Sequence, residues 1–396
     1  MNIFIIPSWY PDSKHLTDGI FIKEQVEALA EFHPGINFTV SVCGNNYMSF
    51  SKPGKALRSL GSFISSEKKE IHLKNNLTEL HCPALTWSAK LGGEVNNIIK
   101  AHAFNLKRAE EKFGNVDLIH AHVSFPGGYS AMSLKKETGI PYVITEHMCP
   151  FPFEMYLNKN KISDKISDPL NNADRIITVS SALSKDVRSF GINAPVVIPN
   201  LVNEEFFIPS EREFSGSKVK FLTLCSFSDR KGIKELLEGI LIAAENSVNF
   251  EITISGTGYP ENYIENFIKE NSLKGKVQFV KDPDRRRLPE MFRQNDAFIL
   301  PSRLESFGIV YIEAMSCGIP VIATDCGGPA DFVKDFNGVL IPVGDPGKIA
   351  EALKYVSENI SGYSKQKIRN FVIENYSRRA VTDKIVTLYK EVLKIY

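Results

Sequence analysis

The sequence contains no long hydrophobic run: no stretch approaches the ~18 consecutive apolar residues that a membrane-spanning helix requires. The apolar segment at residues 1–6 is also too short for a signal peptide. The six cysteines form no C-x-x-C pair and no zinc-like cluster, so we interpret them as reduced thiols. The net charge of +1 provides no overall field that would attract nucleic acid. We therefore expect a cytoplasmic protein without a nucleic-acid partner.

Both halves of the chain follow the same pattern of elements. The hydrophobic (43%) and charged (23%) fractions are ordinary for a globular enzyme, and 396 residues are enough for two cores. Short apolar runs alternate with helical segments, which indicates parallel sheets covered on both faces. These runs lie at residues 3–6, 38–42, 116–120, 142–145, 176–179, 196–198, 221–224, 250–254, 277–280, 297–300, 321–324 and 339–341.

Each half is predicted to be a doubly wound, Rossmann-like α/β domain. The segment 203–218 contains proline, glycine and serine residues and is interpreted as the link between the two domains. We therefore place a first domain at residues 1–202, a second at 203–376 and a last helix at 377–396. Two such domains would direct the carboxyl ends of their strands toward a shared central cleft.

The segment 297–324 is the most informative part of the chain. It is predicted to form a buried strand, a polar loop, a short helix and a second buried strand, with Ser306 as the helix N-cap and Gly318 just beyond its end. A helix N-terminus at the carboxyl edge of a parallel sheet is an anion site. Glu305 and Glu313, with seven residues between them, would repel a diphosphate unless they accept hydrogen bonds from sugar hydroxyls. A nucleotide sugar is therefore the predicted ligand.

This segment resembles the E-x7-E motif of retaining glycosyltransferases of family 4, which have the GT-B fold. The match continues through residues 318–324 and Gly327-Gly328-Pro329. The resemblance implies that Glu313 binds the ribose hydroxyls and that Glu305 holds the donor sugar and its β-phosphate. It also implies that the last helix crosses back to the first domain. The neighbouring donor-binding positions that it implies are Ser306, Phe307, Gly308 and Ile309.

Lys231 follows the first strand of the second half, where its ammonium group can neutralise a diphosphate. Family members usually carry an arginine about five residues earlier, but Cys225-Ser226 occupies those positions here, so Arg230 is the candidate substitute. Gly256 and Gly258 follow the second strand and permit close approach of the backbone to the nucleotide. The resemblance places Val280 and Lys281 at the base, and we expect a UDP-sugar in preference to a GDP-sugar.

No metal or other cofactor is expected. Asp282-Pro283-Asp284 imitates the metal-binding D-x-D of another glycosyltransferase fold, but the following Arg285-Arg286-Arg287 indicates a solvated charge cluster. The resemblance implies that lysine, arginine and helix ends hold the leaving diphosphate without a metal.

In the first half, Gly19 lies in a loop that family members use to border donor and acceptor. His147 ends a buried strand and can hydrogen-bond a sugar hydroxyl or share a proton. His120 and His122 end another strand; we expect alternation to separate their rings onto opposite faces, which argues against a two-histidine metal site. His122 remains a candidate for contact with the acceptor.

Residues 49–74 contain six basic and two acidic residues, interleaved with Leu57, Leu60, Phe63 and Ile64. This composition fits a solvated helix and loop. The alternative is contact with anionic lipid at the inner face of the cytoplasmic membrane, or with a polyprenyl-diphosphate-linked acceptor.

The sequence as a whole predicts a retaining, metal-independent glycosyltransferase that uses a nucleoside diphosphate sugar and builds a surface polysaccharide or lipid-linked glycan. The predicted catalytic residues are His147, Lys231 and Glu305. The alternatives are a GT-B sugar-nucleotide epimerase, a phosphorylase, for which no pyridoxal lysine is found, and a sugar-nucleotide-binding partner without catalysis.

Overall fold

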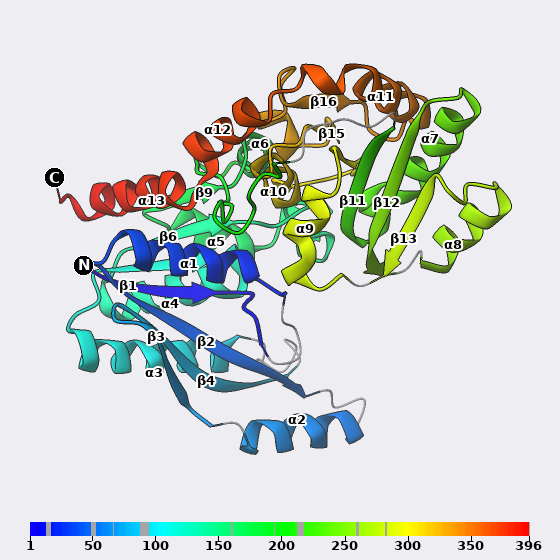
Figure 1. The fold of residues 1–396 in the computed structure, drawn as a ribbon. Helices are drawn as coiled ribbons and strands as arrows, with labels where there is room; N and C mark the ends of the chain where they lie inside the picture. Colours follow the sequence, from blue (N-terminus) through cyan, green and yellow to red (C-terminus); the bar gives the residue numbers. More distant parts are fainter. Residues whose placement is uncertain are drawn as a thin grey trace. The chain divides into compact units, whose positions relative to one another are not determined.

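The computed structural model (Figure 1) describes residues 1–12, 17–48, 53–65, 67–87, 95–159, 161–193, 195–211, 218–258, 261–281 and 283–395. The chain forms two compact units. The first unit comprises Met1–Val179, Ser184–Ile198 and Thr382–Tyr396, and the second comprises Ser180–Leu183 and Pro199–Val381. The end of the chain therefore belongs to the same unit as its beginning.

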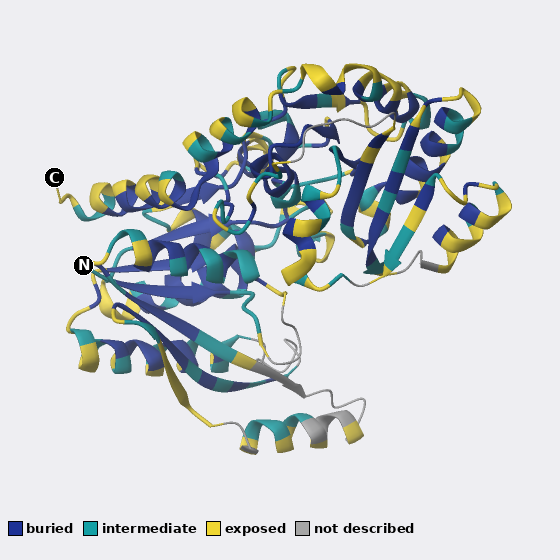
Figure 2. Cartoon of the chain, in the orientation of Figure 1, coloured by how far each residue is buried: buried dark blue, intermediate teal, exposed yellow. Residues whose placement is uncertain are grey.

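The first unit is built on a sheet with strand order β10-β9-β6-β5-β1-β2-β4-β3. Its central strands are buried on both faces, as the dark blue arrows in Figure 2 show. The strands are β1 (Asn2–Pro7), β2 (Asn37–Met48), β3 (Lys69–Lys74), β4 (Leu77–Trp87), β5 (Leu118–His122), β6 (Tyr142–Glu146), β9 (Arg175–Thr178) and β10 (Val196–Val197); β7 (Leu157–Asn158) and β8 (Lys161–Ile162) form a separate pair. The helices are α1 (Ile20–Phe32), α2 (Pro53–Ser65), α3 (Asn96–Phe113), α4 (Tyr129–Thr138) and α5 (Asp164–Asn171), with parts of α6 (Ser181–Ser189) and α13 (Arg378–Leu393).

One edge of this sheet departs from the all-parallel prediction. β3 pairs antiparallel with β4, whereas β4 is parallel to β2. Neither strand was predicted, because polar residues interrupt the apolar residues of β4, and β3 is polar and almost entirely exposed. The interpretation of residues 49–74 as helix and loop is therefore right for α2 and wrong for residues 69–74.

The second unit contains a six-stranded parallel sheet with order β13-β12-β11-β14-β15-β16. Counted from β11, this is the order 3-2-1-4-5-6 of a doubly wound nucleotide-binding fold. Its strands are β11 (Val219–Phe227), β12 (Phe250–Gly258), β13 (Val277–Lys281), β14 (Ala297–Leu300), β15 (Val321–Thr324) and β16 (Gly338–Ile341). Its helices are α7 (Ile233–Glu245), α8 (Glu261–Glu270), α9 (Leu288–Arg293), α10 (Ile309–Ser316), α11 (Pro346–Asn359) and α12 (Lys365–Tyr376).

The core of the second unit explains why these segments take these forms. Strand residues such as Phe221 and Ile252 pack against the apolar faces of α7 and α11, including Leu236 and Leu353. All four side chains are at most 1% exposed. α7 and α11 cover one face of the sheet. The buried strand residues that pack against them fix the positions of the loops that follow the strands.

Candidate active site

The strand order of the second unit reverses between β11 and β14, and this switch point is where doubly wound sheets bind ligands. Lys231 follows β11 and Glu305 follows β14. The Lys231 ammonium Nζ lies 2.6 Å from Glu305 Oε1, which also accepts a hydrogen bond of 2.8 Å from the Ser302 hydroxyl. The two charged side chains are 23% and 11% exposed. The structure thus brings two predicted catalytic residues together at the expected edge of the sheet.

The segment after Glu305 differs from its prediction in one respect. The prediction of Ser306 as the helix N-cap is wrong, because α10 begins at Ile309 with Gly308 as its cap. Gly308 has φ 94°, a left-handed conformation that delays the helix start by two residues, and it makes no side-chain cap. The first N–H groups of α10 therefore lack a side-chain cap, and a helix start of this kind suits an anion.

Phe307, just before α10, is fixed by the packing of its buried side chain. Its side chain is 1% exposed, and its ring packs 5.4 Å from Phe332 and 5.9 Å from Tyr376. A buried aromatic side chain leaves Phe307 only its backbone for contact with a ligand, as the prediction requires. Gly318 lies just beyond the other end of α10 with φ 77°, as predicted.

Glu313 occupies the second turn of α10 and is buried, with 7% of its surface exposed. Its negative charge adds to burial in raising the pKa of the Cys317 thiol to about 12. A buried carboxylate needs hydrogen-bond donors in place of water, and the hydroxyl groups of a ligand can supply them. The proposed contact with ribose stays a prediction.

The remaining predicted donor residues lie on neighbouring strand ends. Gly256 pairs in register with Cys225 on one side and with Lys281 on the other, and Gly258 pairs with Phe227. The Ser255 hydroxyl donates to the Val280 carbonyl oxygen at 3.0 Å. The backbone ends of β11, β12 and β13 therefore form one continuous edge beside Lys231.

Cys225 and Ser226, which occupy the place of the family's arginine, supply no positive charge. Burial raises the pKa of the Cys225 thiol to about 12, so this side chain is neutral. Arg230 lies in the short 3-10 helix that ends at Lys231, and its carbonyl oxygen accepts a hydrogen bond of 2.6 Å from Arg303 N. The guanidinium group of Arg303 pairs with Glu235. Sequence reasoning did not select Ser302 or Arg303, although both directly follow a buried strand.

The first sheet also has a switch point, between β1 and β5; His122 is the last residue of β5, and Gly19 lies in the loop between β1 and α1. Gly19 caps α1 with φ 66°, and a Cβ there would lie 2.2 Å from the Trp9 carbonyl oxygen. Only glycine allows this close approach of the loop to the helix. The loop that the prediction assigned to the substrates is thus tied to the start of α1.

His147 directly follows β6 and is almost wholly buried. Its Nε2 atom lies 3.1 Å from His122 Nδ1, and its ring packs 4.8 Å from Phe21. Burial lowers the pKa of His147 to about 3, so the imidazole is neutral at physiological pH. The structure brings together the two histidines that were predicted to contact the acceptor.

The expectation that alternation separates His120 from His122 is wrong. Their rings are stacked with centroids 4.4 Å apart, because residues two apart on a strand share one face. No group of three or more His, Cys, Asp or Glu side chains suited to a metal occurs in the part of the chain that the structure describes.

Glu146 is a functional candidate that sequence reasoning missed. Its carboxylate is fully buried and accepts hydrogen bonds from Ser124 N (3.0 Å), His147 N (2.8 Å) and Met148 N (2.9 Å). Burial raises its pKa, and the three N–H groups oppose that effect. Glu146 therefore fixes the backbone on which His147 is carried.

The D-x-D imitation falls partly outside the described residues, since Asp282 is not among them. Asp284 caps the turn at 285–287 by accepting from Arg286 N, and its carboxylate pairs with the Arg286 guanidinium at 2.6 Å. This pairing lowers the pKa of Asp284 to about 2. The arrangement is that of a solvated charge cluster.

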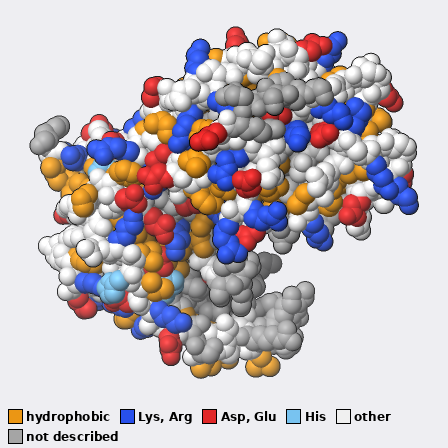
Figure 3. Space-filling view, in the orientation of Figure 1, with side chains coloured by type: hydrophobic (Ala, Val, Ile, Leu, Met, Phe, Trp, Pro, Cys, Tyr) orange, Lys and Arg blue, Asp and Glu red, His pale blue; other side chains and the backbone are white. Residues whose placement is uncertain are grey.

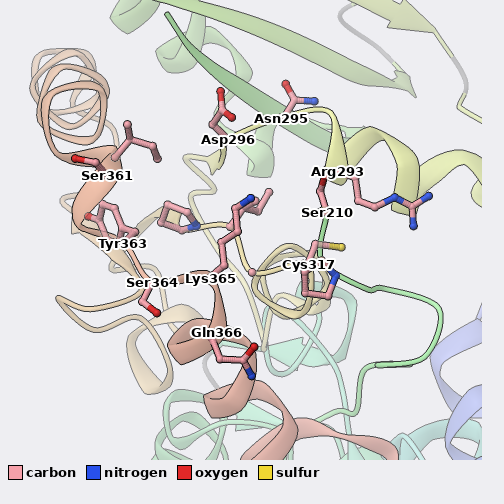
Figure 4. Close-up of a pocket in the computed structure, with 15 residues that line it drawn as sticks. Ser210, Arg293, Asn295, Asp296, Cys317, Ser361, Tyr363, Ser364, Lys365 and Gln366 are labelled. Atoms are coloured by element: carbon pink, nitrogen blue, oxygen red, sulfur yellow. The ribbon is translucent and has the colours of Figure 1, made fainter. Parts of the chain in front are cut away.

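A pocket of ≈ 490 Å³ in the second unit lies away from the predicted site residues (Figure 4). It opens at the amino ends of β14 and β15, the opposite edge of the sheet from Lys231 and Glu305. Its lining includes Arg293, Cys317 and Lys365, and none of the predicted site residues. This pocket lies at the amino ends of the strands and therefore lacks the charged pair and the strand-end loops of the switch point.

In the basic segment, α2 exposes Leu57 (70%) and Ile64 (74%) on one side. Hydrophobic atoms of α2 are visible at the lower edge of Figure 3, and elsewhere on that face positive and negative side chains are interspersed. Lys68 lies 3.7 Å from the Phe104 ring and Lys74 pairs with Glu31. Lys52 and the side chains of Lys55 and Arg58 lie outside the described residues.

Comparison with known proteins identifies the class. Residues 84–206 match the family described as Glycosyltransferase Family 4, and residues 205–376 match Glycosyl transferases group 1. The chain belongs to the glycosyltransferases of this type, which have the GT-B fold. It is therefore an enzyme, and the α/β fold class and family resemblance predicted from the sequence are confirmed.

Three similar proteins illustrate the match. "Uncharacterized glycosyltransferase MJ1178" of Methanocaldococcus jannaschii is 28% identical over 310 residues, which cover 73% of this chain and 84% of that protein. "Uncharacterized 41.2 kDa protein in cps region" of Klebsiella pneumoniae is 26% identical over 327 residues, covering 79% and 88%. The solved structure of Anabaena Alr3699/HepE in complex with UDP has a TM-score of 0.71 at 15% identity, covering 98% of this chain and 99% of that one.

Proposed function

We propose that this glycosyltransferase transfers a sugar from UDP-sugar to a glycan or polyprenyl-diphosphate-linked acceptor, with retention of configuration and without a metal, in surface polysaccharide biosynthesis. The observation that carries the proposal is the contact between Lys231 and Glu305 at the switch point of the second sheet. One cation, one carboxylate and a helix N-terminus at this edge suit a sugar attached to a diphosphate. The UDP in the HepE structure supports a UDP-sugar donor. The name of the Klebsiella relative, a protein in the cps region, supports a role in polysaccharide biosynthesis.

The main catalytic task is to stabilise the negative charge of the leaving diphosphate. Negative charge on its oxygens grows as the bond to the sugar breaks, and the Lys231 ammonium and the N–H groups at the start of α10 stabilise that charge. Glu305 orients Lys231 before the substrate arrives, since it already forms the ion pair. Glu305 also accepts hydrogen bonds from hydroxyls of the donor sugar, as the family motif implies.

A lipid-linked acceptor is favoured by α2. Its exposed leucine and isoleucine side chains face away from the protein, in a segment whose sequence is rich in lysine and arginine. Such a helix suits shallow contact with anionic lipid, at the inner face of the cytoplasmic membrane. No helix within the described ranges is both long and apolar enough to span a bilayer.

Donor choice is tested by thermal unfolding of the full chain with UDP, GDP, ADP and their sugars. A ligand that binds the native state raises Tm by mass action, so at equal concentration UDP and UDP-sugars are expected to raise it most. A larger shift with GDP or GDP-sugars would contradict the proposed base preference while leaving the diphosphate site intact.

Glu313→Ala is expected to weaken binding of the nucleoside diphosphate by about 5- to 150-fold, the equivalent of about 1–3 kcal/mol for a buried hydrogen bond left unpaired. Titration calorimetry on the free nucleotide measures this effect. The matched control is Glu290→Ala, which removes an exposed carboxylate of the same unit. Equal affinities for the two variants would remove Glu313 from the ribose site.

A further inference from the structure

A row of buried side chains connects α13 to His147 within the first unit. The Tyr389 hydroxyl lies 2.5 Å from His120 Nδ1, and His120 Nε2 lies 2.7 Å from Thr145 Oγ1. The His120 ring stacks on His122, whose Nδ1 lies 3.1 Å from His147 Nε2. Tyr389, His120 and His122 are fully buried, whereas His147 keeps 6% of its surface exposed. The row therefore has one end in the core and one end at the surface.

The rings in this row are neutral, which restricts where their protons can be. Burial lowers the pKa of His120 and of His147 to about 3 and holds that of His122 well below its usual range. A neutral imidazole carries one N–H donor and one acceptor nitrogen. The contact between His122 and His147 therefore needs the proton on one of the two facing nitrogens.

The surroundings of His122 decide between the two arrangements. Its Nε2 atom is buried and has no hydrogen-bond partner among the described residues. If His147 donated to His122 Nδ1, the proton of His122 would be on Nε2 as a buried, unpaired N–H, which is rare because nothing replaces the hydrogen bond that the donor makes to water. With the proton on His122 Nδ1, the unpaired atom is only an acceptor.

We infer that His122 donates to His147 Nε2 and thereby holds His147 as the Nδ1–H tautomer. His147 then presents an N–H donor to an oxygen of the sugar or acceptor, and it takes no proton from the incoming hydroxyl. His122 is a positioning residue, and so is Tyr389, which fixes the His120 ring on which His122 stacks. This role for His147 rests on the proposed function, whereas its tautomer does not.

The tautomer is measured directly by long-range ¹⁵N–¹H correlation on the full-length, uniformly labelled protein without substrate. The His147 signals are assigned by their loss in His147→Gln. Protonation on Nδ1 alone at neutral pH is expected. Protonation on Nε2, or on both nitrogens, would overturn the inference even if the enzyme transfers sugar normally.

Two variants test positioning. His122→Phe keeps an aromatic ring in the stack but removes the donor, so His147 should lose its single tautomer. We expect kcat to fall about 10- to 100-fold, the range typical when the partner that orients a metal-ligating histidine is removed, with unchanged affinity for nucleoside diphosphate. Loss of nucleotide affinity in its place would contradict the assignment to sugar or acceptor.

Tyr389→Phe should produce a smaller fall in kcat and a change in the His120 and His147 signals. Its matched control is Tyr142→Phe, which removes another buried hydroxyl of the same unit, bonded at 2.6 Å to the Pro169 carbonyl oxygen and to no histidine. Identical spectra and rates for the two variants would contradict the positioning role of Tyr389. A wild-type protein with Nδ1–H His147 and no transfer would contradict only the proposed function.

Discussion

Replacement of Lys231 by alanine is expected to lower kcat by about 10²- to 10³-fold, the loss typical when one preorganised donor to a developing negative charge is removed. Binding of the intact nucleotide sugar should weaken much less, because charge on the diphosphate oxygens increases as the bond breaks. The contact of 2.6 Å between Lys231 Nζ and Glu305 Oε1 places the ammonium at the switch point before substrate binds. Steady-state kinetics together with calorimetry on the donor separate the two effects.

The matched control is Lys348→Ala. Lys348 also pairs with a glutamate at 2.6 Å, but both partners lie exposed on α11. This variant should retain wild-type rates, because an exposed pair contributes little. If Lys231→Ala weakened donor binding and left kcat unchanged, Lys231 would bind the ground state and the transition state equally.

Gly328→Ala should abolish measurable donor binding and lower stability by about 1–3 kcal/mol, as overpacking of a tight contact does. A Cβ at this position would lie 2.3 Å from Phe307 Cα and 2.5 Å from the Phe307 carbonyl oxygen. The Gly328 N–H also donates to the Glu305 carbonyl oxygen at 3.0 Å. The added methyl group must therefore displace the backbone that carries Glu305 and leads into α10.

Thermal unfolding and calorimetry measure the two losses. Gly362→Ala is the control, because a Cβ there has no neighbour within 4 Å and the backbone is not left-handed. The control should retain both Tm and donor affinity. A Gly328→Ala protein that binds the donor normally would show that the 305–308 segment is not part of the site.

The sequence was sufficient for the strand–helix–strand unit around Glu305 because each element has a local signal. β14 and β15 are apolar runs, and Gly318 ends the helix between them. β4 escaped prediction because Thr78, Glu79 and His81 interrupt its apolar residues and it contains Pro83. The cap of α10 was misplaced because the left-handed conformation of Gly308 depends on the packing around it.

Site residues could be predicted where they follow neighbouring strands of a sheet. They could not be predicted where segments far apart in the sequence come into contact. Lys231 and Glu305 are 74 positions apart, yet each follows a strand that a doubly wound sheet makes neighbours. Tyr389 meets His120 across 269 positions, and no local pattern marks that contact. Glu146 looked like an ordinary strand residue because its partners are backbone N–H groups, which the sequence does not reveal.

The proposed reaction moves a sugar from a nucleoside diphosphate to an acceptor. It is tested most directly by incubating the purified full chain with radiolabelled UDP-, GDP- or ADP-sugars, with either a lipid extract or a water-soluble glycan extract, in the presence and absence of EDTA. We predict that label enters the lipid fraction equally with and without EDTA, and that the product keeps the anomeric configuration of the donor. Conversion of the donor sugar to an epimer without acceptor, or no transfer from any UDP-, GDP- or ADP-sugar, would contradict the account.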